Sequence, residues 1–180
     1  RGRRIRVPPR GVRPTQDKVR EALFSILGEV VQGCRFLDLY AGSGAVGLEA
    51  CSRGAGSACW VESDPGVFRV LARNVAALCP DGGETVRGEA LAFLDRGEGN
   101  GPFDVIFADP PYGPAAVEED GTAERLLAAA SGSRLVAADA LLALESAADG
   151  GETGSEWALL RDRVYGTTRL RVWRLGGQGD

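Results

Sequence analysis

The sequence predicts an α/β fold built on a mostly parallel, Rossmann-like sheet that ends in an antiparallel hairpin. Strand-like apolar segments alternate with amphipathic segments of helical period between residues 35 and 144, and such alternation is typical of βα units. A glycine-rich turn follows the first of these strands. Two further strand-like segments flank a turn at Gly166, which predicts the hairpin.

The length and composition of the chain favour one domain. Its 180 residues are 44% hydrophobic and 26% charged, as in globular soluble proteins. We expect residues 1–14 to form a basic arm and residues 15–180 a single, monomeric domain. No apolar run reaches the roughly 20 residues that span a bilayer, and the basic start is not a secretion signal. A cytoplasmic protein without a membrane partner is therefore expected, with a few native residues preceding Arg1.

Charge is distributed unevenly along the chain. Residues 1–20 contain eight Arg or Lys residues and one Asp, whereas the whole chain has a net charge of −4. A basic arm on an acidic body suits contact with nucleic-acid phosphates. A solvated tail would show the same charges, so the charge pattern alone leaves both interpretations open.

The first predicted helix begins with Thr15 as its N-cap and runs to about Val30. Its apolar residues recur at helical spacing and predict one buried face, made of Val19, Leu23, Ile26, Leu27 and Val30.

Five strands are predicted beyond this helix, at residues 35–40, 57–62, 84–87, 103–108 and 140–144. Helices are expected between them, over about 44–53, 64–79, 90–95 and 123–130. Asp64 followed by Pro65 is a strong start signal for the second of these helices. The hairpin strands are predicted at residues 157–165 and 168–175. Right-handed crossovers place a ligand at the C-terminal ends of the parallel strands.

Cysteine and histidine usage limits the possible chemistry. The chain has four Cys, no Cys-x-x-Cys pair and no His, so we expect buried free thiols and no metal site. A mechanism that depends on a histidine base is excluded.

A glycine-rich turn joins the first strand to the next helix. Asp38 precedes it, and Gly42, Gly44 and Gly47 have the spacing of a dinucleotide fingerprint. Glycines let a ligand approach the backbone, and the helix N-terminus offers free N–H groups. This turn suits NAD or S-adenosylmethionine equally, and a purely structural turn remains an alternative.

Acidic residues follow the second and third strands. Glu62 lies 20 residues after Gly42, where a carboxylate can accept both hydroxyls of a ribose. Glu89 and Ala90 are placed to contact an adenine ring through a carboxylate and a backbone N–H. The alternatives are a solvated acid at Glu62 and a helix cap at Glu89.

The segment Asp109-Pro110-Pro111-Tyr112 follows the most hydrophobic strand, beside the expected cofactor. Two prolines hold the turn rigid. The Asp109 carboxylate and the Pro110 carbonyl can accept hydrogen bonds from an exocyclic base amine, whose lone pair would then be aimed at a methyl donor. Tyr112 offers a face for stacking an extruded base. The motif therefore favours S-adenosylmethionine over NAD, against the alternative of an ordinary Pro-Pro turn.

The chain resembles the RsmD-type 16S ribosomal RNA guanine-N2 methyltransferases over nearly its whole length. The similarity is carried by Arg13–Phe24, Leu37–Gly44, Gly47–Ala50, Val61–Asp64, Asn74, Asp109–Tyr112 and Arg163–Gly166. The hairpin is also the usual ending of the class I methyltransferase sheet, a likeness at the level of the fold.

The resemblance implies methyl transfer from S-adenosylmethionine, with S-adenosylhomocysteine as product, to N2 of a guanine of the 966 type in 16S rRNA or a 30S assembly particle. It implies cofactor contacts at the 41–44 backbone, including Ala41 and Ser43, and at Glu62, Glu89 and Ala90. Asp109 and the residues to Tyr112 would hold the guanine, with Arg13 and Thr15 near cofactor and substrate.

Three alternatives remain open. A DNA adenine-N6 or cytosine-N4 methyltransferase shares the amine chemistry, although 180 residues leave no room for a separate recognition domain. An NAD(P)-dependent oxidoreductase is supported by the glycine spacing alone. A non-catalytic RNA-binding protein could retain the same fold.

Overall fold

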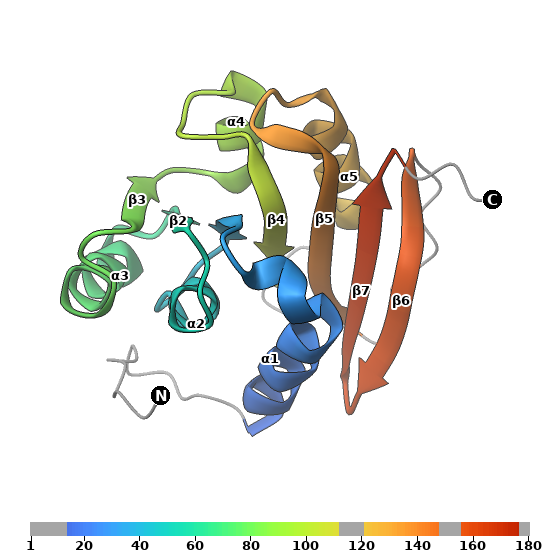
Figure 1. Ribbon diagram of the computed structural model, residues 1–180, viewed down its shortest axis with the longest axis horizontal. Helices are drawn as coiled ribbons and strands as arrows, with labels where there is room; N and C mark the ends of the chain where they lie inside the picture. Colours follow the sequence, from blue (N-terminus) through green and yellow to red (C-terminus); the bar gives the residue numbers. More distant parts are fainter. Residues whose placement is uncertain (1–13, 112–120, 148–155, 177–180) are drawn as a thin grey trace.

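The computed structural model describes residues 14–111, 121–147 and 156–176 (Figure 1). Its helices are α1 (Pro14–Leu27), the 3-10 turn η1 (Gly28–Val31), α2 (Ala45–Ser52), α3 (Pro65–Leu78), α4 (Ala90–Arg96) and α5 (Thr122–Gly132). Its strands are β1 (Arg35–Leu39), β2 (Ser57–Glu62), β3 (Gly83–Arg87), β4 (Phe103–Ala108), β5 (Val136–Ala147), β6 (Trp157–Tyr165) and β7 (Thr168–Leu175).

The strands form one sheet in the order β3-β2-β1-β4-β5-β7-β6. The first five are mutually parallel, and β7 runs antiparallel to both of its neighbours. Figure 1 shows the β6–β7 hairpin at the edge that lies beyond β5. The predicted parallel sheet with a C-terminal hairpin is confirmed.

Helices cover both faces of the sheet, and each face has its own apolar core. Residues of α1, α2 and α3 pack on one face, against Phe36, Trp60 and Phe107. Residues of α4 and α5 pack on the other, against Leu37 and Ile106. Side chains alternate between the two faces along a strand, so Asp38, between Leu37 and Leu39, points to the α1 side.

The start of α3 follows the predicted signal. Asp64 caps the helix, and its Oδ1 accepts hydrogen bonds from the backbone N–H groups of Gly66 and Val67, both at 2.7 Å. Pro65 occupies the first helical position, where no N–H is needed. The cap fixes the direction in which the chain leaves β2, close to Glu62.

The N-terminal helix differs from the prediction at both ends. It begins at Pro14, so Thr15 lies in its first turn and is not the N-cap. At the other end Val30 is 45% exposed and Val31 is buried instead. Gly28 has a φ of +53°, a left-handed conformation that interrupts the α-helix and turns the next residues. The inward position therefore moves from Val30 to Val31.

Two other predictions need adjustment. β5 extends over Val136–Ala147, well beyond the expected residues 140–144, because it pairs with β4 at Val136 and from Leu141 to Leu144, and with β7 from Leu141 to Ala147. Cys34 and Cys59 are buried free thiols, but Cys51 and Cys79 are only partly buried, with their Sγ atoms 2.9 Å apart.

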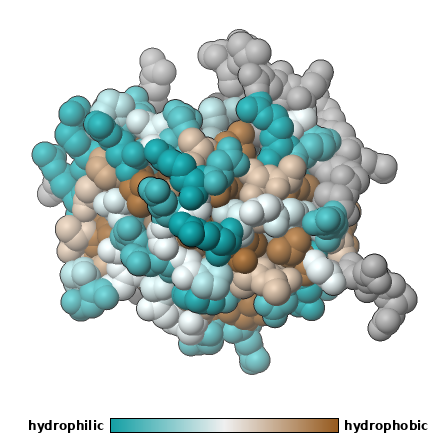
Figure 2. All heavy atoms as spheres, turned by 90° about the horizontal axis from the view of Figure 1, so that it is seen from above, coloured by the Kyte–Doolittle hydropathy of each residue, from teal (hydrophilic) through white to brown (hydrophobic). Residues whose placement is uncertain are grey.

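Seen from above, hydrophilic and hydrophobic residues are interspersed, and no single apolar area dominates this face (Figure 2). Within the described ranges, no helix is both long and apolar enough to cross a membrane.

Candidate active site

The turn between β1 and α2 has an unusual backbone. Tyr40, Gly42 and Gly44 have φ values of +59°, +56° and +84°. This left-handed region is costly for a residue with a side chain, and such conformations occur mainly at functional sites. Gly44 is also the N-cap residue of α2. The chain therefore reverses sharply at the C-terminal edge of the sheet and exposes its backbone there.

Three side chains from different elements hold this turn. Asp38 Oδ2 accepts a hydrogen bond from Gly47 N at 2.9 Å. Trp60 Nε1 donates to Gly44 O at 3.3 Å, and Asn74 Nδ2 donates to Ser43 O at 2.9 Å. Because Asp38, Trp60 and Asn74 are all buried, these hydrogen bonds are shielded from water and hold the loop in place.

Glu62 lies at the end of β2 and is part of the same loop. Its Oε2 accepts from Gly42 N at 2.9 Å, and its Oε1 accepts from Asp64 N at 2.8 Å. Glu62 is half-buried, and both of its carboxylate oxygens are hydrogen-bonded to the backbone of the loop and of the next helix start, so it is more than a solvated acid. Each carboxylate oxygen keeps a second lone pair, so the geometry leaves acceptors for the two hydroxyls of a ribose.

The Glu89–Ala90 pair begins α4 beside Glu62. Gly88 N donates to Glu62 O at 3.1 Å, which brings the end of β3 to the end of β2. Glu89 occupies the N-cap position, but its side chain makes no capping hydrogen bond and is exposed. The side-chain cap proposed as an alternative is absent, and the Ala90 N–H stays at an open helix N-terminus.

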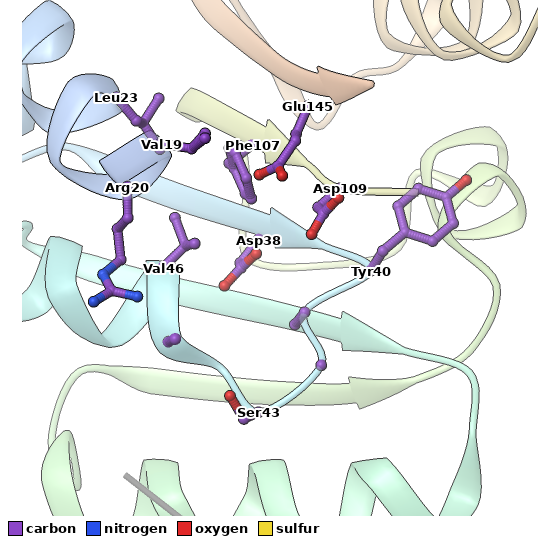
Figure 3. Close-up of a pocket in the computed structure, with 13 residues that line it drawn as sticks. Val19, Arg20, Leu23, Asp38, Tyr40, Ser43, Val46, Phe107, Asp109 and Glu145 are labelled. Atoms are coloured by element: carbon purple, nitrogen blue, oxygen red, sulfur yellow. The ribbon is translucent and has the colours of Figure 1, made fainter. Parts of the chain in front are cut away.

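A pocket opens between α1 and the C-terminal ends of β1, β4 and β5. Figure 3 shows three carboxylates pointing into it, from Asp38, Asp109 and Glu145. Val19, Arg20 and Leu23 of α1, with Ala41, Gly42 and Ser43 of the loop, form other parts of its lining. The glycine loop and the Asp109 motif thus meet in one pocket.

Burial strongly affects the acids of this pocket. It raises the pKa of Asp38 to about 8, against the lowering effect of the hydrogen bond from Gly47 and with a further increase from the charge of Glu62. Burial likewise raises the pKa of Asp109 well above its usual range, and the charges of Glu145 and Asp38 add to the increase. A cation placed among these groups would be strongly favoured.

The remaining predicted site residues belong to the Asp109 motif and to the N-terminal segment. Asp109 N is 3.5 Å from Leu39 O, so the motif starts directly at the sheet edge. Pro110 is buried and Pro111 is exposed. Arg13 and Tyr112 lie outside the described residues. Thr15 belongs to α1, and its side chain also lies outside the described part.

The prediction from sequence missed Glu145, Tyr40 and the residues of α1 that line the pocket. Glu145 has a sequence signal comparable to that of Glu62, because it is a single acid at the end of the apolar strand ALLALE. Tyr40 has none, since a positive φ at a tyrosine follows from the whole turn and not from the residue type.

Comparison with known proteins gives one consistent result. The family model described as Conserved hypothetical protein 95 matches residues 1–174. Ribosomal RNA small subunit methyltransferase D of Escherichia coli K12 is 36% identical over 183 residues, which cover all of this chain and 88% of that protein.

Solved structures agree with this match. The E. coli protein yhhF has a TM-score of 0.79 and 33% identity, covering 96% of this chain and 92% of that one. The T. thermophilus 16S rRNA N2 G1207 methyltransferase, solved with AdoMet and guanosine, has a TM-score of 0.69 at 21% identity. It covers 93% of this chain and 44% of its own, and it shows the shared fold alone.

Replacing Gly47 with alanine is expected to disturb the loop. An added Cβ would lie 2.3 Å from Trp60 Nε1 and 2.6 Å from Trp60 Cε2, and Trp60 is fully buried. We expect Gly47→Ala to lower the free energy of unfolding by about 1–3 kcal/mol and to weaken S-adenosylmethionine binding, measured by urea unfolding and calorimetry. The control is Gly132→Ala, where a Cβ meets nothing within 4 Å. Equal stability and equal affinity in the two variants would contradict the role of this contact.

The raised pKa of Asp38 predicts a pH dependence of stability. Between its ordinary value of 3.8 and about 8, the folded protein holds a proton that the unfolded chain has lost. Stability is therefore expected to fall as pH rises through this window, by at most about 1.4 kcal/mol per pH unit from this one group. Asp38→Asn keeps an acceptor for Gly47 N–H but cannot titrate. Its free energy of unfolding, measured with urea at several pH values, should therefore vary less steeply with pH. The exposed Asp139→Asn serves as control, and a slope unchanged by Asp38→Asn would refute the assignment.

Proposed function

The chain belongs to the RsmD-type family of ribosomal RNA small subunit methyltransferases, and on this premise we propose that it methylates the exocyclic N2 amine of a guanine in 16S ribosomal RNA, with guanine 966 as the expected target. S-adenosylmethionine is the methyl donor and S-adenosylhomocysteine the product. The observation that carries the proposal is the meeting of the glycine loop and Asp109 in one pocket of carboxylates.

The residues of the loop fit S-adenosylmethionine. When bound, this cofactor supplies an electrophilic methyl group on a positively charged sulfonium. Glu62 would accept the ribose hydroxyls, and Glu89 and Ala90 would contact the adenine. The 41–44 backbone and Asp38 would hold the methionine end, where buried carboxylates favour its positive charges. The same buried acids argue against a dinucleotide, whose pyrophosphate they would repel.

Asp109 and Pro110 would hold the target amine. The N2 lone pair of guanine is delocalised into the ring, so the free amine is a poor nucleophile. Hydrogen bonds from its N–H groups to the Asp109 carboxylate and the Pro110 carbonyl would orient the lone pair for attack. When the methyl group passes from the sulfonium sulfur to N2 and leaves S-adenosylhomocysteine, the nitrogen would lose a proton, and the Asp109 carboxylate would be its direct acceptor. Tyr112 would stack on the extruded base.

The substrate and setting follow from the family and from the charge pattern. Arg13 and Thr15 would lie near cofactor and substrate, and the basic residues of the arm would contact RNA phosphates. We propose a monomer that acts in the cytoplasm on 16S rRNA or on a 30S assembly particle. Residues 1–14 are proposed to form the arm and residues 15–180 one domain.

Methyl transfer tests this function directly. Tritium from labelled S-adenosylmethionine should enter 16S rRNA or 30S particles prepared from cells that lack the enzyme, and a mass map should place the methyl group on N2 of one guanine. Duplex DNA tests the DNA-methyltransferase alternative, and calorimetry with NAD tests the oxidoreductase alternative. Absence of transfer to both RNA substrates by folded, cofactor-bound protein would refute the proposal.

Asp109→Ala is expected to reduce turnover by roughly 100-fold or more, the typical effect of losing one positioned hydrogen-bond partner at a reacting centre. The affinity for S-adenosylmethionine should change little, because Asp38, Glu62 and the loop backbone remain. Single-turnover transfer to 16S rRNA and calorimetry measure the two quantities. Asp139→Ala, an exposed change on β5, is the matched control. Turnover unchanged by Asp109→Ala would refute the assigned role.

A further inference from the structure

Glu145 is a buried carboxylate for which the reaction described above has no use. It lies near the C-terminal end of β5 and is 5% exposed. Ala108 of β4 pairs with Leu144 of β5, so the next residues along the two strands, Asp109 and Glu145, lie side by side on the α1 face. Figure 3 shows both carboxylates directed into the same pocket.

The strand order separates the possible roles of the three acids. β4 lies between β1 and β5, so Asp109 lies between Asp38 and Glu145. Asp38 is bonded to the first turn of α2, on the side of the cofactor loop. Glu145 is on the opposite side of Asp109, away from the glycine turn. A group held by Asp109 would therefore meet Asp38 on its cofactor side and Glu145 on its other side.

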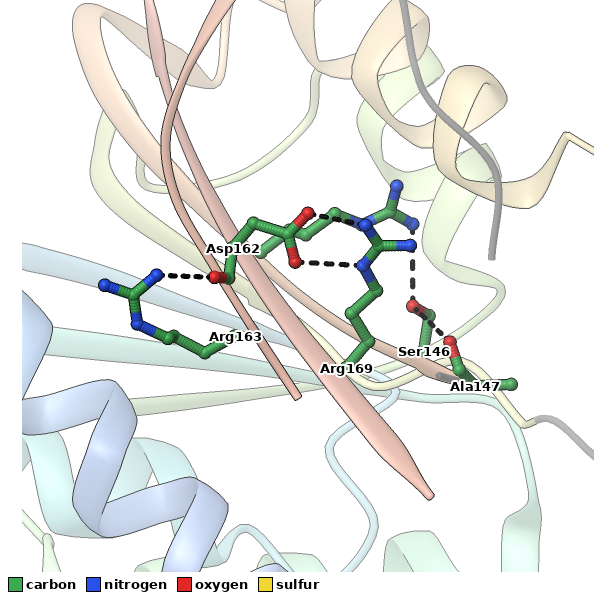
Figure 4. Close-up of polar contacts among 6 residues, drawn as sticks. Ser146, Ala147, Asp162, Arg163 and Arg169 are labelled. Atoms are coloured by element: carbon green, nitrogen blue, oxygen red, sulfur yellow. Dashed lines mark hydrogen bonds and ion pairs between the residues drawn. The ribbon is translucent and has the colours of Figure 1, made fainter. Parts of the chain in front are cut away.

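The end of β5 is held firmly by the hairpin. Glu145 is opposite Leu170 of β7 in the antiparallel register. The next residue, Ser146, accepts a hydrogen bond from Arg171 Nη2 at 3.5 Å, and Arg169 is paired with Asp162 on the neighbouring strand at 2.6 Å and 2.9 Å (Figure 4). These contacts keep Glu145 in a defined place, as a residue that selects a substrate must be.

Guanine differs from adenine and cytosine in the hydrogen-bonding character of a ring nitrogen next to its amine. Its N2 amine is flanked on one side by N1–H, which is a hydrogen-bond donor, and on the other side by N3, which is an acceptor. The amines of adenine and cytosine are flanked by an unprotonated ring nitrogen, which is an acceptor. A carboxylate next to the amine therefore attracts guanine and repels the lone pair of adenine or cytosine.

We propose that Glu145 accepts a hydrogen bond from N1–H of the target guanine and so selects guanine over other amino bases. This inference rests on the proposed function and extends it to base specificity. Asp109 and Pro110 hold the reacting amine, and Glu145 reads the neighbouring ring position. With guanine bound, each of the two neighbouring carboxylates would have its own N–H donor, which offsets the repulsion between them.

The test compares two bases that carry the same 2-amine. After the mass map has located the target, 16S rRNA is assembled by ligation with either guanine or 2,6-diaminopurine at that position. Diaminopurine keeps the amine but has an unprotonated N1. The wild-type protein is expected to prefer guanine by roughly tenfold or more in kcat/KM, the value of a charge-assisted hydrogen bond.

Glu145→Gln should lower kcat/KM for guanine by roughly tenfold or more and should not lower that for diaminopurine, because the amide does not repel the N1 lone pair and can donate a hydrogen bond to it. Glu156→Gln, an exposed change of the same type, should leave both rates unchanged. Circular dichroism and calorimetry with S-adenosylmethionine check the fold and cofactor site. If Glu145→Gln does not fold, Glu145→Asp takes its place and should keep the preference for guanine at a lower rate.

Several outcomes would overturn the inference. Equal losses on both bases would make Glu145 a structural residue, and an unchanged guanine rate would remove it from the site. A weakened S-adenosylmethionine affinity with an unchanged base preference would move it to the cofactor. Lack of transfer to guanine RNA by the wild-type protein is a different result, because it refutes the proposed function itself.

Discussion

The hydrogen bond between the Asp38 carboxylate and Gly47 N–H joins the end of β1 to the first turn of α2. This bond closes the sharp turn between β1 and α2, and the position of the loop backbone in the site depends on that turn. Between these two residues the backbone passes through left-handed conformations at Tyr40, Gly42 and Gly44. Such a turn is strained, and the fully buried Trp60 supports it from below through Gly44 O. Glycine at position 47 is required because the indole ring occupies the space that a Cβ would need.

This arrangement also explains why acids gather in the pocket. Carboxylates at the ends of β1, β4 and β5 point to the same face because the strands are parallel and in register. Burial makes their charged forms costly, which raises the pKa values of Asp38 and Asp109. A sulfonium and an ammonium group would relieve this cost on one side of Asp109, and N–H donors of a base would relieve it on the other. The acidic pocket is thus suited to a cationic cofactor beside a hydrogen-bond-donating substrate.

The sequence predicted most of this framework, because its strongest signals are local. Alternation of apolar strands and helices, the Asp64–Pro65 cap and the hairpin at Gly166 each depend on neighbouring residues, and the structure confirms them. The failures arose where distant contacts decide the outcome. The length of β5 depends on its two partners, and the exposure of Val30 depends on a reversal at Gly28. Glu145 does have a sequence signal at the end of its strand, but its place beside Asp109, 36 positions earlier in the chain, follows only from the strand register.

The Asp-Pro-Pro-Tyr motif by itself does not explain base selection. An exocyclic amine that is held by a carboxylate and a carbonyl looks the same to those two acceptors in guanine, adenine and cytosine. Discrimination must come from a group that contacts the ring position beside the amine, because that is where the donor and acceptor pattern of these bases differs. On the α1 face of the described sheet, the residue next to Asp109 on the side away from the cofactor loop is Glu145. The proposed roles thus place chemistry and specificity on different strands, which would let β5 set the target base without altering the motif proposed to activate the amine.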